Sequence, residues 1–231
     1  MIKNLLKNIF CFVLACFLFQ SSFGCRRSFV NDEELYRDTI KKTVEIRCFD
    51  TVEKMGFATG CVISENGLIL TNKHVVMTDE DHYFQNIEVR FFDCDDFIVA
   101  DVMRVSESED LALIRIDRKT EEAFLVGNHV NGGEEVYTIG NPNGFGLSFL
   151  KGTVSAPERC VVYKGQEIKT TQVSIVINEG NSGGPLFNAN GELIGLITFR
   201  LRNTSKEIIQ GVSFALHFTS IQQFLRLEYI I

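Results

Sequence analysis

From Thr43 onward, apolar and polar residues alternate, a period of two that is typical of β-strands with one buried face. In the first run, Val44 and Ile46 alternate with Glu45 and Arg47. Similar runs, separated by turn residues, occupy positions 55–64, 68–71, 86–93, 97–105, 111–116, 135–139, 147–155, 160–163, 168–173, 185–187, 193–199 and 208–216. Many short strands without long helices between them predict an antiparallel barrel or sandwich.

Two segments have helical character instead. Asn31 and Glu34 form a capping pair, which predicts a short helix that reaches about Lys42. Near the end of the chain, Ile221 and Phe224 lie on one face at helical spacing. A polar connection rich in glycine and asparagine is typical of a boundary between two lobes. The predicted organisation is a leader over residues 1–24, an N-terminal segment with the short helix over 25–42, a first lobe over 43–126, the connection over 127–134, a second lobe over 135–217 and a C-terminal helix over 218–231.

The leader has the pattern of a secretory signal. Lys3 and Lys7 precede an apolar run over residues 9–19, which is shorter than the roughly 20 residues of a membrane-spanning helix. An uncleaved amphipathic anchor is the alternative. The segment 22–25 resembles a relaxed bacterial lipobox, which predicts lipidation at Cys25 and a membrane tether there. An ordinary signal-peptidase cut before Cys25 also fits, and either cut predicts export to the periplasm or cell envelope.

The charge balance narrows the classes of partner. The chain of 231 residues has 23 Lys and Arg against 30 Asp and Glu, a net charge of −7. A net acidic chain without a basic run has no electrostatic footprint for nucleic acid. Protein, peptide or small-molecule partners therefore remain.

The cysteines give no sign of a metal site. Outside the leader and Cys25, they stand at positions 48, 61, 94 and 160, with no CxxC pair and no Cys/His cluster. The acidic clusters lack the spacing of a calcium loop. We therefore expect neither metal nor cofactor. Two disulfides are one prediction for an oxidising compartment, but the apolar strands around Cys48 and Cys61 favour buried thiols there.

The most informative segment for chemistry surrounds Ser182. Gly180 precedes this serine by two residues, and two further glycines follow it. Such a turn exposes a hydroxyl and directs the N–H groups of Gly180 and Ser182 toward one point, as an oxyanion hole requires. A glycine-rich turn with an incidental serine is the alternative.

A serine hydroxyl needs a base, and the base needs a carboxylate to orient it. Of the four histidines, His74 follows an apolar strand that can hold it rigidly, whereas His82 and His129 stand in polar loops and His217 follows the last strand. Asp110 opens an apolar strand, where a partly buried carboxylate requires a partner.

In these segments the chain resembles trypsin-fold serine proteases of the HtrA/Deg type. The resemblance spans about residues 43–228 and is carried by Leu70-Thr-Asn-Lys-His74-Val-Val, Glu109-Asp110-Leu-Ala-Leu, Gly180-Asn-Ser-Gly-Gly-Pro-Leu186 and Gly211-Val-Ser-Phe-Ala-Leu216, in the family's order. The resemblance implies an all-β fold of two antiparallel six-stranded barrels, over residues 43–126 and 135–217, followed by a C-terminal helix.

The resemblance also implies roles for individual residues. His74, Asp110 and Ser182 would form the catalytic triad, and Gly180 with Ser182 the oxyanion hole. The primary substrate pocket would be lined by Val176, Thr198, Phe199, Arg200, Gly211 and Ser213. None of these offers a carboxylate, so we expect an aliphatic residue before the cut. Activity would be switched by surface loops, expected at residues 142–151, 156–169 and 201–210.

The chain also departs from this family. Only 49 residues follow Ser182, so no PDZ domain is expected there. The N-terminal extension through which many relatives form trimers is short, which leaves a trimer as one prediction for the assembly. The predicted function is a secreted or membrane-tethered serine endopeptidase acting on proteins or peptides, including unfolded ones, in quality control or processing. The alternatives are a catalytically silent binding or chaperone-like protein on this fold, and an esterase using the same triad.

Overall fold

The computed structural model describes residues 31–51, 55–78, 82–163, 165–202 and 207–226. The predicted leader, the candidate lipidation site at Cys25 and the final residues 227–231 lie outside this range. Among the helices in the described ranges, none combines the length and apolar composition needed to cross a membrane.

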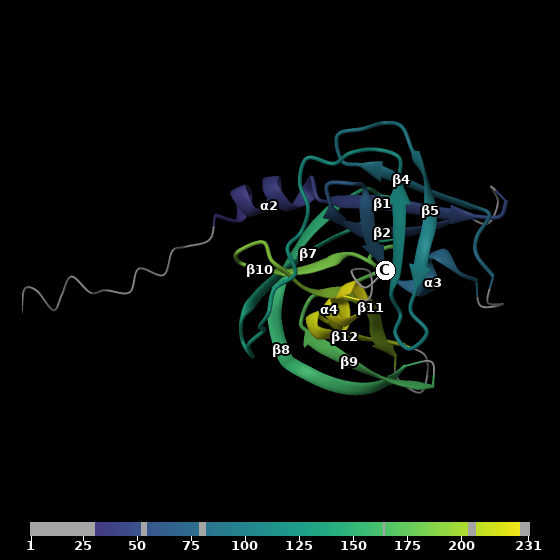
Figure 1. The fold of residues 1–231 in the computed structure, drawn as a ribbon. Coiled ribbons are helices and arrows are strands. Elements are labelled where there is room, and N and C mark those ends of the chain that lie inside the picture. Colours follow the sequence, from purple (N-terminus) through teal and green to yellow (C-terminus); the bar gives the residue numbers. More distant parts are fainter. Residues whose placement is uncertain (1–30, 52–54, 79–81, 164, 203–206, 227–231) are drawn as a thin grey trace, which may run out of the picture. The chain divides into compact units, whose positions relative to one another are not determined.

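Within the described ranges, twelve strands form two closed six-stranded antiparallel barrels, which confirms the expected fold class (Figure 1). The first barrel has the order β1-β2-β3-β6-β5-β4 and the second β10-β11-β12-β9-β8-β7. The first contains β1 (Thr43–Phe49), β2 (Gly56–Ser64), β3 (Leu68–Thr71), β4 (Asn86–Phe91), β5 (Ile98–Val105) and β6 (Ala112–Ile116). The second contains β7 (Glu135–Gly140), β8 (Ser148–Tyr163), β9 (Gln166–Val173), β10 (Pro185–Asn188), β11 (Leu193–Arg202) and β12 (Ile208–His217).

Alternation along the strands explains the two hydrophobic cores. In β1, Val44, Ile46 and Cys48 point into the first core and are at most 3% exposed. Glu45 points outward but is also buried. Arg90 on the neighbouring strand β4 donates to both of its carboxylate oxygens at 3.2 Å. Paired charges of this kind satisfy a carboxylate that has lost its water.

The four cysteines within the described ranges have free thiols, and two of them belong to the interior. Cys48 and Cys61 are buried, which confirms the prediction of buried thiols, whereas Cys94 is half-buried and Cys160 exposed. Burial raises the pKa of Cys48 to about 12, and it also raises the pKa of Cys61. Both thiols are therefore protonated and unreactive at neutral pH.

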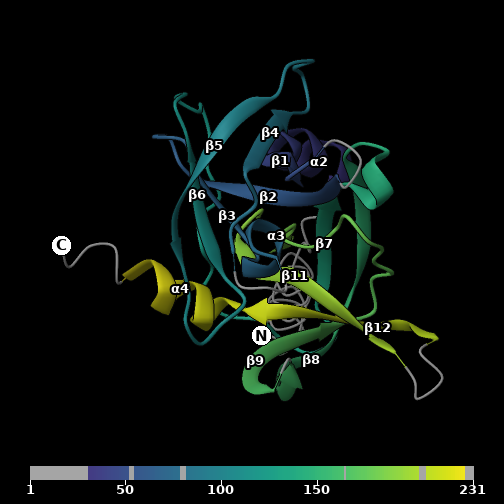
Figure 2. The ribbon, with the colours of Figure 1, turned by 90° about the vertical axis from the view of Figure 1, so that its right-hand side faces the viewer.

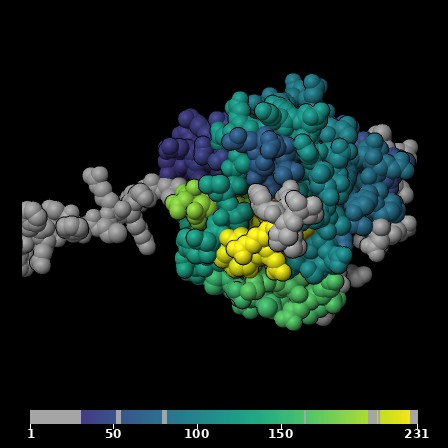
Figure 3. All heavy atoms as spheres, viewed as in Figure 1, coloured from purple at the N-terminus to yellow at the C-terminus, as the bar shows by residue number. Residues whose placement is uncertain are grey.

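In the part of the chain that the structure describes, four short helical elements accompany the barrels: α2 (Asp32–Ile40), α3 (Lys73–Val76), the 3-10 turn η2 (Pro142–Gly144) and α4 (Phe218–Arg226). Figure 2 shows α4 continuing from β12 toward β6, so the last helix returns to the first barrel. There Ser220 donates to Glu109 at 3.0 Å, and Gln222 donates to the carbonyl of Gly127 at 2.9 Å. Figure 3 shows this helix, in yellow, at the surface between segments of both barrels.

The strands predicted at 160–163 and 168–173 are confirmed, whereas the surface loop that the resemblance implied over residues 156–169 is wrong for most of that segment. Most of this segment belongs to the long antiparallel pair of β8 and β9, whose register runs to Tyr163 opposite Gln166. Two bulges near Pro157 interrupt the pairing, because proline has no N–H to donate to the ladder. Similarly, residues 148–151 of the expected loop 142–151 begin β8, and the loop expected at 201–210 includes the ends of β11 and β12.

Candidate active site

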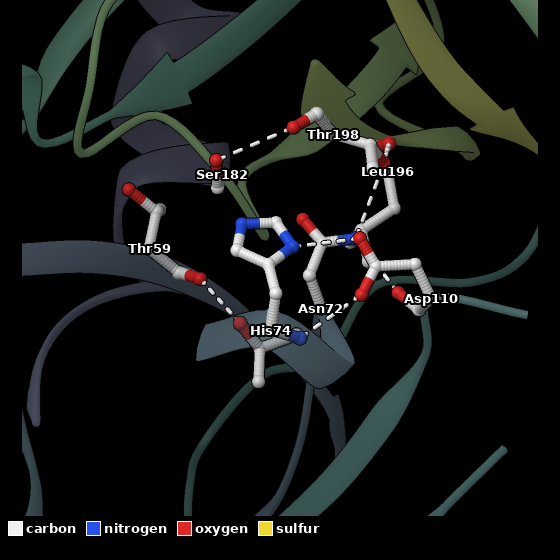
Figure 4. A network of polar contacts seen from close by, with 8 residues as sticks. Thr59, Asn72, His74, Asp110, Ser182, Leu196 and Thr198 are labelled. Atoms are coloured by element: carbon white, nitrogen blue, oxygen red, sulfur yellow. Dashed lines mark hydrogen bonds and ion pairs between the residues drawn. The ribbon is translucent and has the colours of Figure 1, made fainter. Parts of the chain in front are cut away.

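Three segments far apart in the sequence position the candidate catalytic residues. His74 is the second residue of α3, which is separated from β3 by Asn72 alone. Asp110 lies two residues before β6, also in the first barrel, and Ser182 lies in the turn that precedes β10 of the second. Figure 4 shows the imidazole of His74 lying between the carboxylate of Asp110 and the side chain of Ser182.

Asp110 binds both the side chain and the backbone of His74. Its Oδ2 lies 2.6 Å from Nδ1 of the imidazole, and its Oδ1 accepts the backbone N–H of His74 at 2.9 Å. The Asp110 side chain is only 10% exposed, so this contact is largely shielded from water. A carboxylate at Nδ1 favours the tautomer that carries its proton there, which leaves Nε2 as an acceptor.

Asn72 supports this pair from behind, a role that the sequence analysis missed. Its completely buried side chain donates to the backbone carbonyl of Asp110 at 2.8 Å and to Oγ1 of Thr198 at 3.1 Å. Because Thr198 belongs to β11, Asn72 connects the histidine segment with the second barrel. An amide at the end of an apolar strand, two residues before the histidine, was the signal in the sequence.

Ser182 and His74 line one cavity of about 230 Å³, together with Gly180. The Ser182 hydroxyl donates to the backbone carbonyl of Thr198 at 3.4 Å. Among the described residues, no hydrogen bond joins Ser182 to His74. The structure therefore brings the three predicted residues together, but the Ser182 hydroxyl donates to the Thr198 carbonyl and not to His74.

The turn around Ser182 depends on two glycines with positive φ. Gly180 has φ +94°, and a Cβ there would lie 2.0 Å from the carbonyl oxygen of Asn141. Gly183 has φ +81°, and a Cβ there would lie 2.1 Å from the carbonyl oxygen of Thr59. Only glycine fits both the conformation and the close backbone approach. The glycine pattern of the sequence thus reflects how tightly this turn packs on its neighbours.

The peptide between Glu179 and Gly180 has a fixed orientation. Its carbonyl oxygen accepts the N–H of Asn143 at 2.8 Å. In a trans peptide the N–H points to the side opposite the carbonyl, so the Gly180 N–H points away from Asn143. Within the described part of the chain, the N–H groups of Gly180 and Ser182 have no hydrogen-bond acceptor.

The six predicted pocket residues lie around two adjoining cavities. Thr198, Phe199 and Arg200 line a cavity of about 280 Å³ together with Ser182. A smaller cavity of about 50 Å³ has the lining residues Val176, Ile177, Asn178, Arg200, Ile209, Gln210, Gly211 and Ser213. Ile177 and Asn178, which line both cavities, were not predicted from the sequence.

A further cavity, of about 410 Å³, also has His74 in its lining. It is lined by both barrels, with Asp110 and Glu109 on one side and Tyr163 on the other. Burial raises the pKa of Glu109; the hydrogen bond from Ser220 opposes this shift, and the charge of Asp110 adds to it. No group of three or more His, Cys, Asp or Glu side chains suited to a metal ion occurs in the described ranges.

Comparisons with known proteins identify the family of this chain. The family described as trypsin-like peptidase domain matches residues 58–196. A probable periplasmic serine endoprotease, DegP-like, from Pseudomonas putida is 38% identical over 146 residues, which are 62% of this chain and 29% of that protein. Serine protease HTRA1 from Xenopus tropicalis is 32% identical over 173 residues, which are 72% of this chain and 35% of that protein. The chain thus spans about a third of the length of these relatives.

A solved structure has the same fold. The structure of the HtrA-type protease AlgW with tripeptide superposes with a TM-score of 0.74 at 26% sequence identity. The alignment covers 84% of this chain and 62% of that one. The chain therefore belongs to the trypsin-like peptidase domain family, with HtrA-type and DegP-like serine proteases among its relatives.

Proposed function

We propose that this chain is a serine endopeptidase that hydrolyses peptide bonds through an acyl-enzyme on Ser182. The observation that carries the proposal is the contact of His74 with Asp110 beside a serine that lines the same cavity. The relatives named as serine proteases support the same reaction class.

In the proposed mechanism, His74 acts as the general base. Its Nε2 accepts the proton of Ser182 as the hydroxyl attacks the scissile carbonyl, and later returns a proton to the leaving amine. In the absence of substrate, catalytic hydrogen bonds are often long or misaligned. In the proposed mechanism, rotation about the Cα–Cβ bond of Ser182 moves its hydroxyl from Thr198 toward Nε2 of His74. Asp110 holds the imidazole and stabilises its positive charge.

The oxyanion would be bound by the N–H groups of Gly180 and Ser182. Two observations support this role: both groups are without an acceptor among the described residues, and the Glu179 carbonyl is held on the opposite side of its peptide by Asn143. Preorganised donors of this kind are effective because they need no reorganisation during the reaction, and loss of one costs about 10²–10³ in rate.

The proposed substrates are proteins or peptides, with an aliphatic residue before the cut, in quality control or processing. The proposed location is the periplasm or cell envelope, supported by relatives named periplasmic and by the sequence pattern of residues 1–24. The lipid tether at Cys25 remains a prediction of that pattern.

The test is labelling with a fluorophosphonate probe, followed by digestion of casein. The native chain should be labelled and should degrade casein, whereas Ser182→Ala should do neither and should keep its thermal unfolding transition. Ser155→Ala, at an exposed position on β8, is the matched control and should behave like the native chain. Labelling that persists in Ser182→Ala would contradict the proposal. Labelling without casein degradation favours the esterase, and absence of labelling favours the silent binding protein.

A further inference from the structure

The cavity of about 230 Å³ that contains Ser182 and His74 in its lining has an apolar wall. Gly180, whose N–H belongs to the proposed oxyanion hole, also lines it. The wall comes from the first barrel and the segments beside it, and its apolar residues are Cys48, Phe57, Ala58, Val75 and Phe84. An uncharged surface therefore lies next to the candidate nucleophile and its base.

This cavity differs from the pocket proposed for the residue before the cut. That pocket, of about 280 Å³, is lined by Thr198, Phe199 and Arg200 of β11. Of the described residues, its lining includes Ser182 but not His74. Ser182 thus borders two cavities, and the general base belongs to the one with the apolar wall.

The proposed mechanism assigns the two halves of a substrate to these two cavities. After the bond breaks, the acyl half stays on Ser182, while the leaving amine must lie within hydrogen-bond reach of Nε2 of His74. That nitrogen belongs to the residue directly after the cut, so the side chain of this residue begins next to both His74 and Ser182. The cavity of about 410 Å³ contains His74 but not Ser182 among its described lining residues, so it lies further from the cut.

The lining of the 230 Å³ cavity suits an apolar side chain. Cys48, Ala58 and Val75 are at most 6% exposed, and burial raises the pKa of Cys48 to about 12, so its thiol is uncharged. Phe57 is 42% exposed and Phe84 is half-buried, so both still present apolar surface to water. A side chain that covers this surface gains the free energy of removing it from water.

The size of the cavity also permits large side chains. A cavity that holds a benzene molecule has about 150 Å³, and this one has about 230 Å³. It therefore has space for the side chains of leucine, isoleucine, methionine and phenylalanine.

The charged groups at the cavity give little attraction to a charged side chain. Glu179 also lines it, but its carboxylate lies 3.7 Å from Nη2 of Arg200, which belongs to the other cavity. A basic side chain would compete with Arg200 for this carboxylate, and an acidic one would be repelled by it. His74 becomes positive only during the reaction in the proposed mechanism.

We propose that this cavity binds the side chain of the residue directly after the cut and selects substrates with a large apolar residue there. This inference rests on the proposed endopeptidase function and adds a second specificity site to it, on the leaving-group side. Phe57 and Phe84 would be specificity-determining residues, because they supply the aromatic surface that the substrate covers.

The experiment measures acyl transfer by the full chain. A peptide thiobenzyl ester that ends in valine acylates Ser182: the hydroxyl oxygen bonds to the acyl carbon, and benzyl thiol leaves with the proton taken up by His74. Water or the α-amine of an added amino-acid amide then bonds to the acyl carbon, and the Ser182 oxygen leaves and regains a proton through His74. Because aminolysis is the reverse of acylation by a peptide, the added amide occupies the place of the residue after the cut.

The ratio of aminolysis to hydrolysis, measured by mass spectrometry at equal concentrations of unprotonated amine, reports binding in this cavity. For the native chain it should be at least about tenfold higher with leucine amide than with glycine amide. Phenylalanine amide should also exceed glycine amide, whereas lysine amide and glutamate amide should stay within about threefold of it. Both products form from one acyl-enzyme, so the ratio does not depend on how fast a variant is acylated.

The variants change the apolar wall. Phe57→Asn and Phe84→Asn place a polar amide in it, and each should reduce the preference for leucine amide over glycine amide at least about threefold. Phe84→Leu keeps the wall apolar and should retain most of the preference. Phe92→Asn replaces a phenylalanine that is 55% exposed and outside this lining, and should keep the native ratio.

Two results would overturn the inference and leave the proposed function intact. One is a native chain for which leucine amide is no better than glycine, lysine or glutamate amide, and the other is a native preference in both Phe57→Asn and Phe84→Asn. If a variant forms no acyl-enzyme, the series of amides with the native chain decides alone. If the native Ser182 is not acylated at all, the proposed function fails and the inference fails with it.

Discussion

Asp110 uses its two carboxylate oxygens for two different contacts with one residue. One oxygen accepts the backbone N–H of His74, and the other pairs with its Nδ1. The ring position and its tautomer are thus fixed by a single side chain. The backbone of Asp110 is in turn held by Asn72, which also contacts Thr198 in the second barrel. At the scale of residues, the site is a chain of buried polar contacts that begins in one barrel and ends in the other.

Asp110→Asn should therefore lower kcat by about 10⁴ with little change in stability. An asparagine side chain has one acceptor oxygen and one NH₂ group, whereas Asp110 uses two oxygens. The NH₂ group would therefore face a second donor, either the backbone N–H or the Nδ1 proton of His74. The ring then favours protonation on Nε2, which can no longer accept the proton of Ser182. The rate of fluorophosphonate labelling and casein digestion measures the effect, with thermal unfolding as the check on folding. A variant that keeps more than about a tenth of the native rate would show that Asp110 does not fix the tautomer.

At the scale of elements, β2 of the first barrel positions the turn before β10 of the second. The Thr59 hydroxyl donates to the carbonyl of Gly180 at 2.7 Å and accepts the N–H of Asn141 at 2.9 Å. The Thr59 N–H also donates to the carbonyl of Ser182 at 2.9 Å. One strand thus holds both sides of the turn that presents the candidate nucleophile.

Thr59→Val should lower the free energy of unfolding by about 2 kcal/mol, because it leaves a buried carbonyl and a buried N–H without a partner. It should also slow fluorophosphonate labelling, since the Gly180 peptide loses its support. Chemical denaturation and labelling rates measure the two effects.

Thr39→Val is the matched control for this variant. Thr39 is equally buried, but its hydroxyl donates to the carbonyl of Leu35 within α2, remote from the candidate site. Its substitution should cost stability without changing the labelling rate. Equal labelling of Thr59→Val and the native chain would mean that the turn keeps its conformation without this bridge.

At the scale of the whole molecule, the end of β12 and the start of α4 form a buried junction. His217 is 4% exposed, its ring contacts Phe218, and its Nδ1 accepts the N–H of Thr219 at 3.3 Å. Burial lowers the pKa of His217; the charge of Glu158 opposes this shift, and that of Lys169 adds to it. The folded protein therefore favours the neutral ring.

This lowered pKa predicts a loss of stability in mild acid. The unfolded chain takes up a proton at about pH 6.5, the ordinary value for histidine, while the folded protein resists it until lower pH. The stabilisation is therefore present above about pH 6.5 and is lost as the pH falls toward the folded pKa. Thermal unfolding between pH 8 and pH 5 measures it.

His217→Gln should lack this component, so its difference in Tm from the native chain should change with pH. His129→Gln removes an exposed histidine and should keep the native pH profile. A native profile in His217→Gln would assign the acid sensitivity to other groups.

The sequence by itself determined the positions of most strands, because alternation is a local property of the chain and one buried face requires it. The run Leu68–Thr71 was predicted with the bounds of β3. The resemblance implied a surface loop over 156–169, whereas the local pattern had already predicted strands at 160–163 and 168–173, and the pairing of β8 with β9 agrees with the local pattern. The residues His74, Asp110 and Ser182 were predicted from motifs, and their catalytic roles remain predictions.

Only the tertiary structure decided which distant groups meet. The position of Asn72 at the end of an apolar strand was visible in the sequence, but the groups that Asn72 and Thr59 bind in the second barrel were not. The position of the Arg200 side chain depends on carbonyl and amide oxygens more than twenty residues away. Such contacts are set by the packing of two closed barrels against each other, which no local pattern of residues encodes.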